Sequence, residues 1–159
     1  MKIRTGFGFD VHRLLEGRDL WLGGILVPHT LGLLGHSDAD VLIHAICDAL
    51  LGAANMRDIG YHFPDSASEF ENIDSKVLLR KTVGLIASKG YRIGNIDATV
   101  CAERPKLKNY IPQMQKVLAE VMNIDVDDVS IKATTTEKLG FTGREEGISA
   151  YAVVLISKD

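Results

Sequence analysis

Three side chains in the first third of the chain have the types and the spacing of a metal site. Asp10 and His12 stand two residues apart in the segment 3–14, whose composition predicts a β-strand. Side chains at i and i+2 of a strand leave from one face, so these two would lie side by side, with Val11 pointing into the core. His44 lies further on, in a pattern of apolar residues with helical period. One carboxylate and two imidazoles suit a catalytic Zn²⁺ ion with an open fourth position.

The same residues also have a plainer explanation. A single histidine in an apolar helix is more often a hydrogen-bonded core residue than a ligand, and an Asp-x-His triplet is common by chance. Asp48 lies one helical turn beyond His44, where it would either support the ligands or touch the substrate. The metal site therefore needs support from other segments.

Two polar segments could bind an anion. His36 and Ser37 precede the helix that contains His44, and free amides at a helix N-terminus attract phosphate. Capping of that helix by Ser37, Asp38 or Asp40 explains the same residues equally well. The segment 104–108 carries three cations, which would meet a phosphate or a base edge, or would simply form a solvated turn.

The segment Ala133–Lys138 has the least ordinary composition. Its three consecutive threonines make a poor core but good hydrogen-bonding partners for phosphate and ribose. If they continue a strand, Thr135 faces away from its two neighbours. Glu137 can ligate a hard cation such as Mg²⁺ between two phosphates. An exposed strand end rich in threonine is the weaker explanation, because Arg144 follows with another cation.

The order of elements around these residues predicts an α/β sandwich in which helices cover one face of the sheet. Strands are expected at 3–14, 20–28, 91–103, 128–136 and 148–158, and helices at 40–54, 73–90 and 114–124, with 31–40 as a loop. The polar loop 55–70 is long enough to be functional. Within it, Asp58–Gly60 and Phe63–Asp65 offer acceptors for polyol hydroxyls, or are only turn residues.

Composition excludes several classes of protein. The 159 residues fit one domain, 1–159, and the net charge of −3 with scattered basic residues argues against a nucleic-acid partner. No apolar run is long enough for a membrane span, and the start carries no targeting segment, so we expect a cytoplasmic protein. Cys47 and Cys101 have no metal-ligand spacing and are expected to be reduced core residues.

Together these segments resemble the 2-C-methyl-D-erythritol 2,4-cyclodiphosphate synthase family of the non-mevalonate isoprenoid pathway. The matching stretches are GFDVH, HSDADV, HAICDALLGAA, DIGYHFPD, NIDATVCAERPK, IPQM and KATTTEKLGFTGR. The resemblance implies a mixed β-sheet and a phosphorus–oxygen lyase. Its substrate would be 4-diphosphocytidyl-2-C-methyl-D-erythritol 2-phosphate, and its products the 2,4-cyclodiphosphate and CMP.

The resemblance also implies the metals and the assembly. Asp10, His12 and His44 would hold one Zn²⁺ per subunit, and Glu137 would hold the Mg²⁺ or Mn²⁺ that accompanies the substrate diphosphate. The family forms homotrimers through its sheets, with each active site between two subunits, and its ligand is a small cytidine diphosphate. No nucleic acid or membrane would take part.

The resemblance assigns catalytic roles to His36 and Thr135, which would polarise phosphate in the transition state. Phe141 and Arg144 would lie near the threefold interior. The implied substrate contacts are Asp10, His12, His36, Ser37, Asp58, Ile59, Gly60, Phe63, Pro64, Asp65, Ser66, Ala67, Ala102, Glu103, Arg104, Pro105, Lys106, Leu107, Lys108, Thr134, Thr135, Thr136, Glu137, Phe141 and Arg144.

Two rival functions fit the same residues less well. The first is a phosphohydrolase that uses a zinc-bound water, which would give an open diphosphate as its product. The second is a trimer that binds a nucleotide or a prenyl diphosphate with little catalysis.

Overall fold

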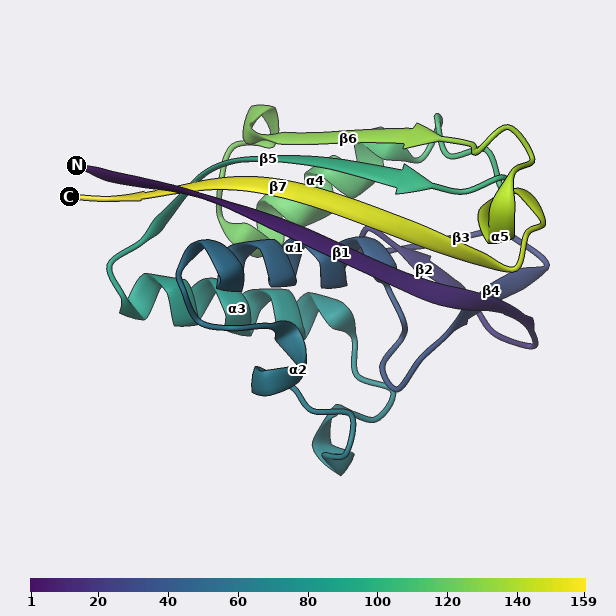
Figure 1. Ribbon diagram of the computed structural model, residues 1–159, viewed down its shortest axis with the longest axis horizontal. Helices are drawn as coiled ribbons and strands as arrows, with labels where there is room; N and C mark the ends of the chain where they lie inside the picture. The colour runs from purple at the N-terminus through teal and green to yellow at the C-terminus, as the bar shows by residue number, and fades with distance from the viewer.

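A five-stranded mixed sheet forms the backbone of the fold in the computed structural model, which describes residues 1–159 (Figure 1). The strand order is β4-β1-β7-β5-β6. Only β5 and β6 are parallel, and the other neighbours are antiparallel. The predicted mixed α/β architecture is therefore confirmed. The strands are β1 (Lys2–Glu16), β4 (Leu31–Leu34), β5 (Arg92–Cys101), β6 (Val129–Thr134) and β7 (Gly147–Lys158).

The three long helices, α1, α3 and α4, lie on one face of this sheet (Figure 1). Helix α1 packs against β1 and β7 on one side and against α3 on the other, so it is buried almost all round. None of the helices combines the length and the apolar composition that a membrane span requires. The helices are α1 (Val41–Ala53), α2 (Ile59–His62), α3 (Ser75–Ser88), α4 (Ile111–Met122) and α5 (Gly140–Gly143), with short 3₁₀ turns η1 (Ser68–Phe70) and η2 (Val126–Asp128).

The open face of β1 corrects one prediction. Val11 was expected in the core, but it is 42% exposed and points away from the helices, as Phe7 and Phe9 do. The reason is that the even-numbered residues of β1 face the helices, and the inner positions from Arg4 to His12 hold only small or polar residues. The apolar side of this strand is therefore its open side.

Two elements between residues 20 and 34 also differ from the prediction. The expected single strand 20–28 is a hairpin of β2 (Leu20–Leu22) and β3 (Ile25–Val27), because Gly23 and Gly24 both adopt positive φ and turn the chain. The expected loop contains β4, which pairs with the end of β1 at the edge of the sheet. Its sequence LGLL has no strand-like alternation, so only the pairing partner reveals it.

Two further segments differ from the prediction in where their helices lie. Helix α4 begins at Ile111 rather than 114, since Pro112 is tolerated in the first turn of a helix. The predicted loop 55–70 contains α2 and η1, which fold it over the cavity described below.

Candidate metal and phosphate site

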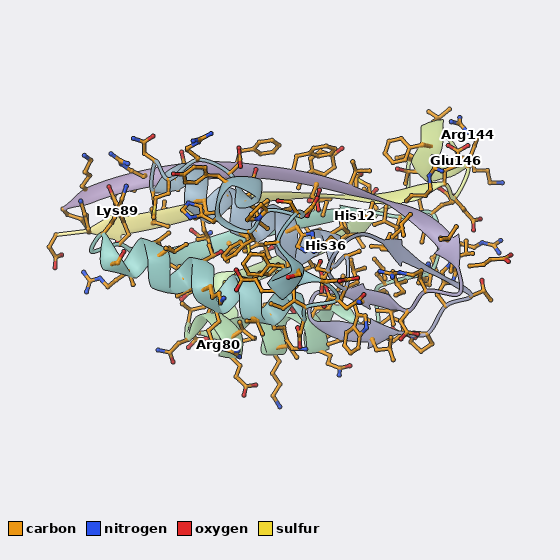
Figure 2. All side chains as sticks on the ribbon, turned by 90° about the horizontal axis from the view of Figure 1, so that it is seen from below. His12, His36, Arg80, Lys89, Arg144 and Glu146 are labelled. Carbon is orange, nitrogen blue, oxygen red and sulfur yellow. The ribbon has the colours of Figure 1, made fainter.

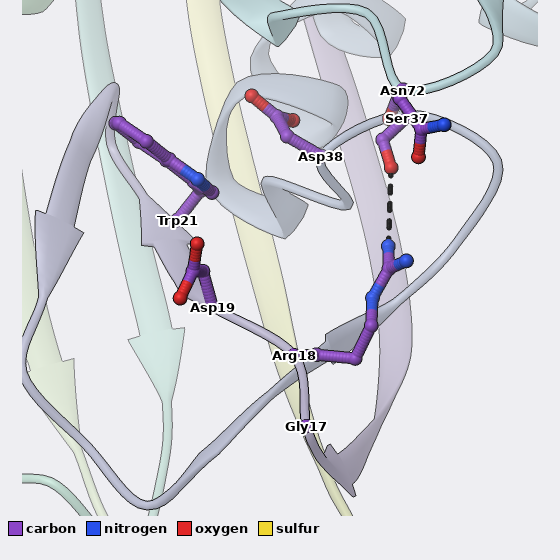
Figure 3. A pocket seen from close by; sticks show the side chains of 7 residues that line it. All are labelled: Gly17, Arg18, Asp19, Trp21, Ser37, Asp38 and Asn72. Atoms are coloured by element: carbon purple, nitrogen blue, oxygen red, sulfur yellow. Dashed lines mark hydrogen bonds between the residues drawn. The ribbon is translucent and has the colours of Figure 1, made fainter.

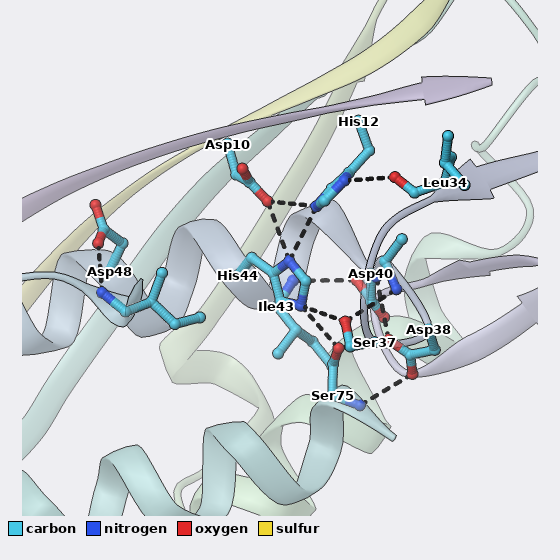
Figure 4. A network of polar contacts seen from close by, with 12 residues as sticks. Asp10, His12, Leu34, Ser37, Asp38, Asp40, Ile43, His44, Asp48 and Ser75 are labelled. Carbon is cyan, nitrogen blue, oxygen red and sulfur yellow. Dashed lines mark hydrogen bonds and ion pairs between the residues drawn. The ribbon is translucent and has the colours of Figure 1, made fainter. Parts of the chain in front are cut away.

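Asp10, His12 and His44 converge as the spacing predicts (Figure 4). Asp10 Oδ2 lies 2.9 Å from His12 Nε2 and 3.1 Å from His44 Nδ1, and the two ring nitrogens are 3.1 Å apart. Strand β1 provides the first two side chains and helix α1 the third. We call these three residues the triad.

The hydrogen bonds around the triad test whether it fits a metal ion. His12 Nδ1 lies 2.9 Å from the Leu34 carbonyl oxygen, which can only accept, so Nδ1 carries the proton and Nε2 presents its lone pair to the triad. Ligand atoms of a tetrahedral zinc site are about 3.3 Å apart, given Zn–N bonds of about 2.0 Å. The observed separations are close to that spacing, so the triad can hold a metal ion.

The electrostatics of the triad favour a charged carboxylate. Burial alone would raise the pKa of Asp10, but hydrogen bonds and charge from His12 and His44 outweigh it and hold the pKa well below its usual range. Burial would lower the pKa of His12, but the hydrogen bond to Asp10 raises it. An ionised carboxylate is the form that binds a cation.

A cavity of about 390 Å³ lies beside the triad. Its lining includes the three residues of the triad, both predicted phosphate-binding residues before α1, and part of the loop around α2. His36 Nε2 lies 3.2 Å from the Ala67 carbonyl oxygen, which ties the two sides together. The predicted residues that line this cavity are Asp10, His12, His36, Ser37, His44, Ile59, Gly60, Phe63 and Asp65, whereas Asp58, Pro64, Ser66 and Ala67 stand outside its lining.

The loop before α1 is shaped by a buried carboxylate. Of the three possible caps, Asp40 is the one that accepts from the amide of Ile43, at 3.1 Å. It also accepts from the amides of Gly23 and Gly24, at 3.0 and 2.7 Å. Asp40 therefore anchors the β2–β3 hairpin to the start of α1 and leaves the preceding residues free to face the cavity.

Asp48 does not support the triad, which settles one of the alternatives left open above. Its Oδ1 accepts from the amide of Ile59 at 3.1 Å. Asp58 in turn caps α2 by accepting from the amide of Tyr61 at 2.8 Å. Both carboxylates fix the α2 segment that lines the cavity.

A second cavity, of about 330 Å³, lies where the parallel strands β5 and β6 end. Lys106 and Lys108, two of the implied substrate contacts, bring two positive charges to it. Its lining contains Ala102, Pro105, Lys106, Leu107, Lys108, Ile111, Ala133, Thr134 and Thr135. The predicted contacts Glu103, Arg104, Thr136 and Glu137 lie outside this lining.

The three threonines differ in how their hydroxyl groups are used. Thr134 donates to the Thr135 carbonyl at 3.1 Å, and Thr136 donates to the Leu139 carbonyl at 2.6 Å. Thr135 accepts from the amide of Glu137 at 3.2 Å, so its own proton remains available. The expected alternation of side chains does not apply, because β6 ends at Thr134 and both Thr134 and Thr135 line the cavity.

A single chain does not bring the two cavities together. They share no lining residue, and strand β6 is separated from β1 by two strands. Neighbouring strands lie about 4.8 Å apart, so this separation is about 14 Å.

Arg144 pairs with Glu146 at 3.1 Å, and Figure 2 shows this pair far from His12 and His36. Neither Arg144 nor Phe141 lines either cavity.

The sequence analysis did not identify Arg18, which donates hydrogen bonds to the loop before α1 on the side away from the first cavity. Its guanidinium donates to the carbonyls of Leu33, Gly35 and Ser37, at 3.2, 3.3 and 3.4 Å. It lies in a third, polar cavity of about 290 Å³ on the other side of that loop (Figure 3). An arginine between a glycine and an aspartate reads as a solvated turn, so no local signal could have identified it.

Comparison with known proteins agrees with this geometry. The model of the YgbB family matches residues 3–157. A 2-C-methyl-D-erythritol 2,4-cyclodiphosphate synthase of Bacteroides fragilis is 81% identical over 158 residues, which are 99% of each chain.

Two solved structures share the fold. The bifunctional IspDF of Campylobacter jejuni superposes with a TM-score of 0.96 at 43% identity over 99% of this chain, which spans only 43% of that longer protein. The CDP complex of Plasmodium falciparum IspF superposes with a TM-score of 0.87 at 37% identity, over 99% of this chain and 97% of that one.

Proposed function

The chain belongs to the YgbB family, and from that premise we propose that it closes a cyclic diphosphate on a methylerythritol and releases CMP. The substrate is 4-diphosphocytidyl-2-C-methyl-D-erythritol 2-phosphate, whose 2-phosphate attacks the β-phosphate intramolecularly to give 2-C-methyl-D-erythritol 2,4-cyclodiphosphate. The observation that carries this proposal is the 81% identity, over nearly the whole chain, to a relative of that name. The chain acts as one domain, 1–159.

The triad fits a zinc ion, one per subunit, because its lone pairs converge at tetrahedral spacing. A zinc ion held by these residues would supply positive charge to neutralise and polarise the β-phosphate. We assign Mg²⁺ or Mn²⁺ to Glu137, whose carboxylate is a hard oxygen ligand and takes part in none of the ion pairs within this chain.

The protein's own task is mainly one of orientation. Both reacting groups are on one molecule, and a phosphate oxygen is already a nucleophile, so no general base is needed. The α2 side of the first cavity holds the methylerythritol, and the second cavity holds cytidine and its diphosphate. Thr135 donates a hydrogen bond to a phosphate oxygen that gains charge in the transition state, and His36 does the same once its Nε2–H leaves the Ala67 carbonyl for the phosphate.

The substrate must reach both cavities, which supports a homotrimer with sites between subunits. The open sheet face exposes a row of large apolar side chains that no helix of the same chain covers, and large exposed apolar patches mark interfaces. The exposed residues on β1 and β7 are Ile3, Phe7, Phe9, Val11, Tyr151 and Val153. A neighbouring copy packed there would cover these side chains, and we propose that it also brings its second cavity to this copy's triad, in head-to-tail contacts that close into a cyclic ring.

Phosphorus NMR tests the proposed reaction. The purified protein is incubated with the cytidylyl substrate, zinc and magnesium in ¹⁸O-labelled water. We expect coupled resonances of a cyclic diphosphate, together with CMP and no incorporated label. An open diphosphate carrying solvent oxygen would instead identify a phosphohydrolase, and ligand binding without turnover would identify a binding protein.

A further inference from the structure

The two ring nitrogens of His44 face different surroundings. Nδ1 points to the other members of the triad (Figure 4). Nε2 points to the protein interior, where Ser75 Oγ lies at 2.9 Å and Ser37 Oγ at 3.2 Å. A neutral imidazole carries one proton, so its position decides whether Nδ1 can present a lone pair to a metal ion.

The direction of the Ser75 hydroxyl is set by Asp38. Ser75 Oγ donates to Asp38 Oδ1, and the backbone amide of Ser75 donates to Asp38 Oδ2 at 2.9 Å. An ionised carboxylate can only accept, so the single hydroxyl proton of Ser75 is directed to Asp38. Ser75 Oγ can therefore only accept from His44 Nε2, which places the imidazole proton on Nε2 and frees Nδ1.

Ser37 cannot fix the tautomer in the same way. Its Oγ accepts from the amide of Ala39 at 3.1 Å, and no carboxylate holds its proton. That proton can point to His44 or into the cavity. The protein thus supplies only one oriented acceptor for Nε2, and Ser75 provides it.

The segments that carry this pair are joined by backbone hydrogen bonds. The amide of Asp38 donates to the Ile73 carbonyl at 3.1 Å, and the amide of Asn72 donates to the His36 carbonyl at 2.7 Å. Ser75 is fully buried as the first residue of α3. These bonds hold the loop before α1 against the start of α3 and keep the two side chains within hydrogen-bonding reach.

We propose that Asp38 and Ser75 are a positioning pair that holds His44 in the tautomer and orientation needed for metal binding. This proposal rests on the metal site of the proposed function. His12 has its tautomer fixed by a backbone carbonyl, so His44 is the ligand whose state depends on side chains. Groups that orient a ligating histidine in this way typically contribute 10- to 100-fold to metal affinity.

Zinc affinity measured by competition with a chromophoric chelator tests the pair. We expect Ser75→Ala to weaken zinc binding by about 10- to 100-fold relative to the parent. Thr82→Val is the matched control, because Thr82 is fully buried on the same helix and its hydroxyl has no hydrogen-bond partner. Zinc affinity of Ser75→Ala within twofold of the parent would overturn the proposal.

The tautomer of His44 gives a readout that a purely structural role would not change. Two-bond ¹H–¹⁵N correlation spectra of the metal-free protein in mildly alkaline buffer should show the proton on Nε2 in the parent. In Ser75→Ala it should move to Nδ1, where Asp10 Oδ2 accepts it at 3.1 Å. An unchanged tautomer in a folded variant contradicts the proposal.

Asp38→Asn is a second variant in case Ser75→Ala does not fold. The amide replaces one of the two acceptors by a donor, so the Ser75 hydroxyl loses its fixed direction and zinc affinity should again fall at least about tenfold. Parent-like affinity in this folded variant would reject the pair but leave the proposed function intact. Failure of the parent itself to bind zinc would reject the metal site and, with it, the pair.

Discussion

Gly8 lies so close to Ala45 that a Cβ atom added to Gly8 would stand 1.9 Å from the Ala45 carbonyl oxygen. Gly6 makes the same kind of contact with Ala49, at 2.0 Å. Helix α1 therefore rests directly on the backbone of β1. His44 precedes Ala45 on this helix, so the close approach is what lets it reach the two ligands on the strand.

Gly8→Ala should push α1 away from β1. We expect the free energy of unfolding to fall by about 1–3 kcal/mol, the usual cost of overpacking, and zinc affinity to fall because His44 moves with the helix. Urea unfolding and chelator competition measure the two effects. Gly52→Ala is the control, since an added Cβ there meets nothing within 4 Å. It should raise stability by about 0.4–1 kcal/mol, and a Gly8→Ala protein as stable as the parent would refute the contact.

His12→Ala and His44→Ala should each lose bound zinc and activity while the fold remains. Each removes one of three ligands, and a carboxylate with one imidazole holds zinc weakly. Elemental analysis after dialysis measures the metal, and circular dichroism measures the fold. Asp48→Asn should keep its zinc, because that carboxylate binds the Ile59 amide instead. Full zinc content in both histidine variants would disprove the assignment.

Phe9→Glu should weaken the proposed trimer. Phe9 is 46% exposed in the single chain and packs against Tyr151 of β7 with tilted rings at a centroid distance of 5.1 Å, in the middle of the open face. A buried, unpaired carboxylate in an interface is strongly unfavourable. Sedimentation equilibrium should show a trimer for the parent and smaller species for the variant, whereas a monomeric parent at micromolar concentration would exclude the proposed assembly.

Local pattern singled out the triad, and the family resemblance supported it as a metal site, but neither predicted its environment. Asp10 and His12 share a strand face by the period of two, and His44 lies in a helix with an obvious apolar pattern. The contact between Asp38 and Ser75 joins residues 37 positions apart, so no window of sequence contains it. The prediction that Val11 faces the core was wrong for a related reason. The inner positions of β1 hold glycines because helix α1, which comes later in the chain, packs directly against them.

Glu137→Gln should keep zinc but weaken the magnesium dependence of turnover. The neutral amide is a poorer ligand for a hard cation than a carboxylate, so more Mg²⁺ is needed for half-maximal rate. Glu137 has a left-handed backbone, with φ of +54°, and glutamine tolerates it as well as glutamate does. Titration of the rate with magnesium tests this, and a curve that superposes on that of the parent would mean that Glu137 is not a ligand.

Thr135→Val should impair the chemical step more than substrate binding. Among the three consecutive threonines, Thr135 is the one whose hydroxyl proton is not already donated to a carbonyl of its own chain. It lines the cavity assigned to the diphosphate, so this proton can reach a phosphate oxygen. Charge on that oxygen grows as the phosphorus becomes five-coordinate, and a donor placed there stabilises the transition state more than the ground state.

Valine keeps the shape and the β-branch of Thr135 but removes the donor. Loss of one such donor typically lowers kcat by about 10²–10³-fold. Thr136→Val is a useful comparison, because its hydroxyl closes the turn to Leu139 and should affect stability rather than kcat. Steady-state kinetics separate the two roles. A raised KM with unchanged kcat in Thr135→Val would mean that the hydroxyl binds ground state and transition state equally and has no part in the chemical step.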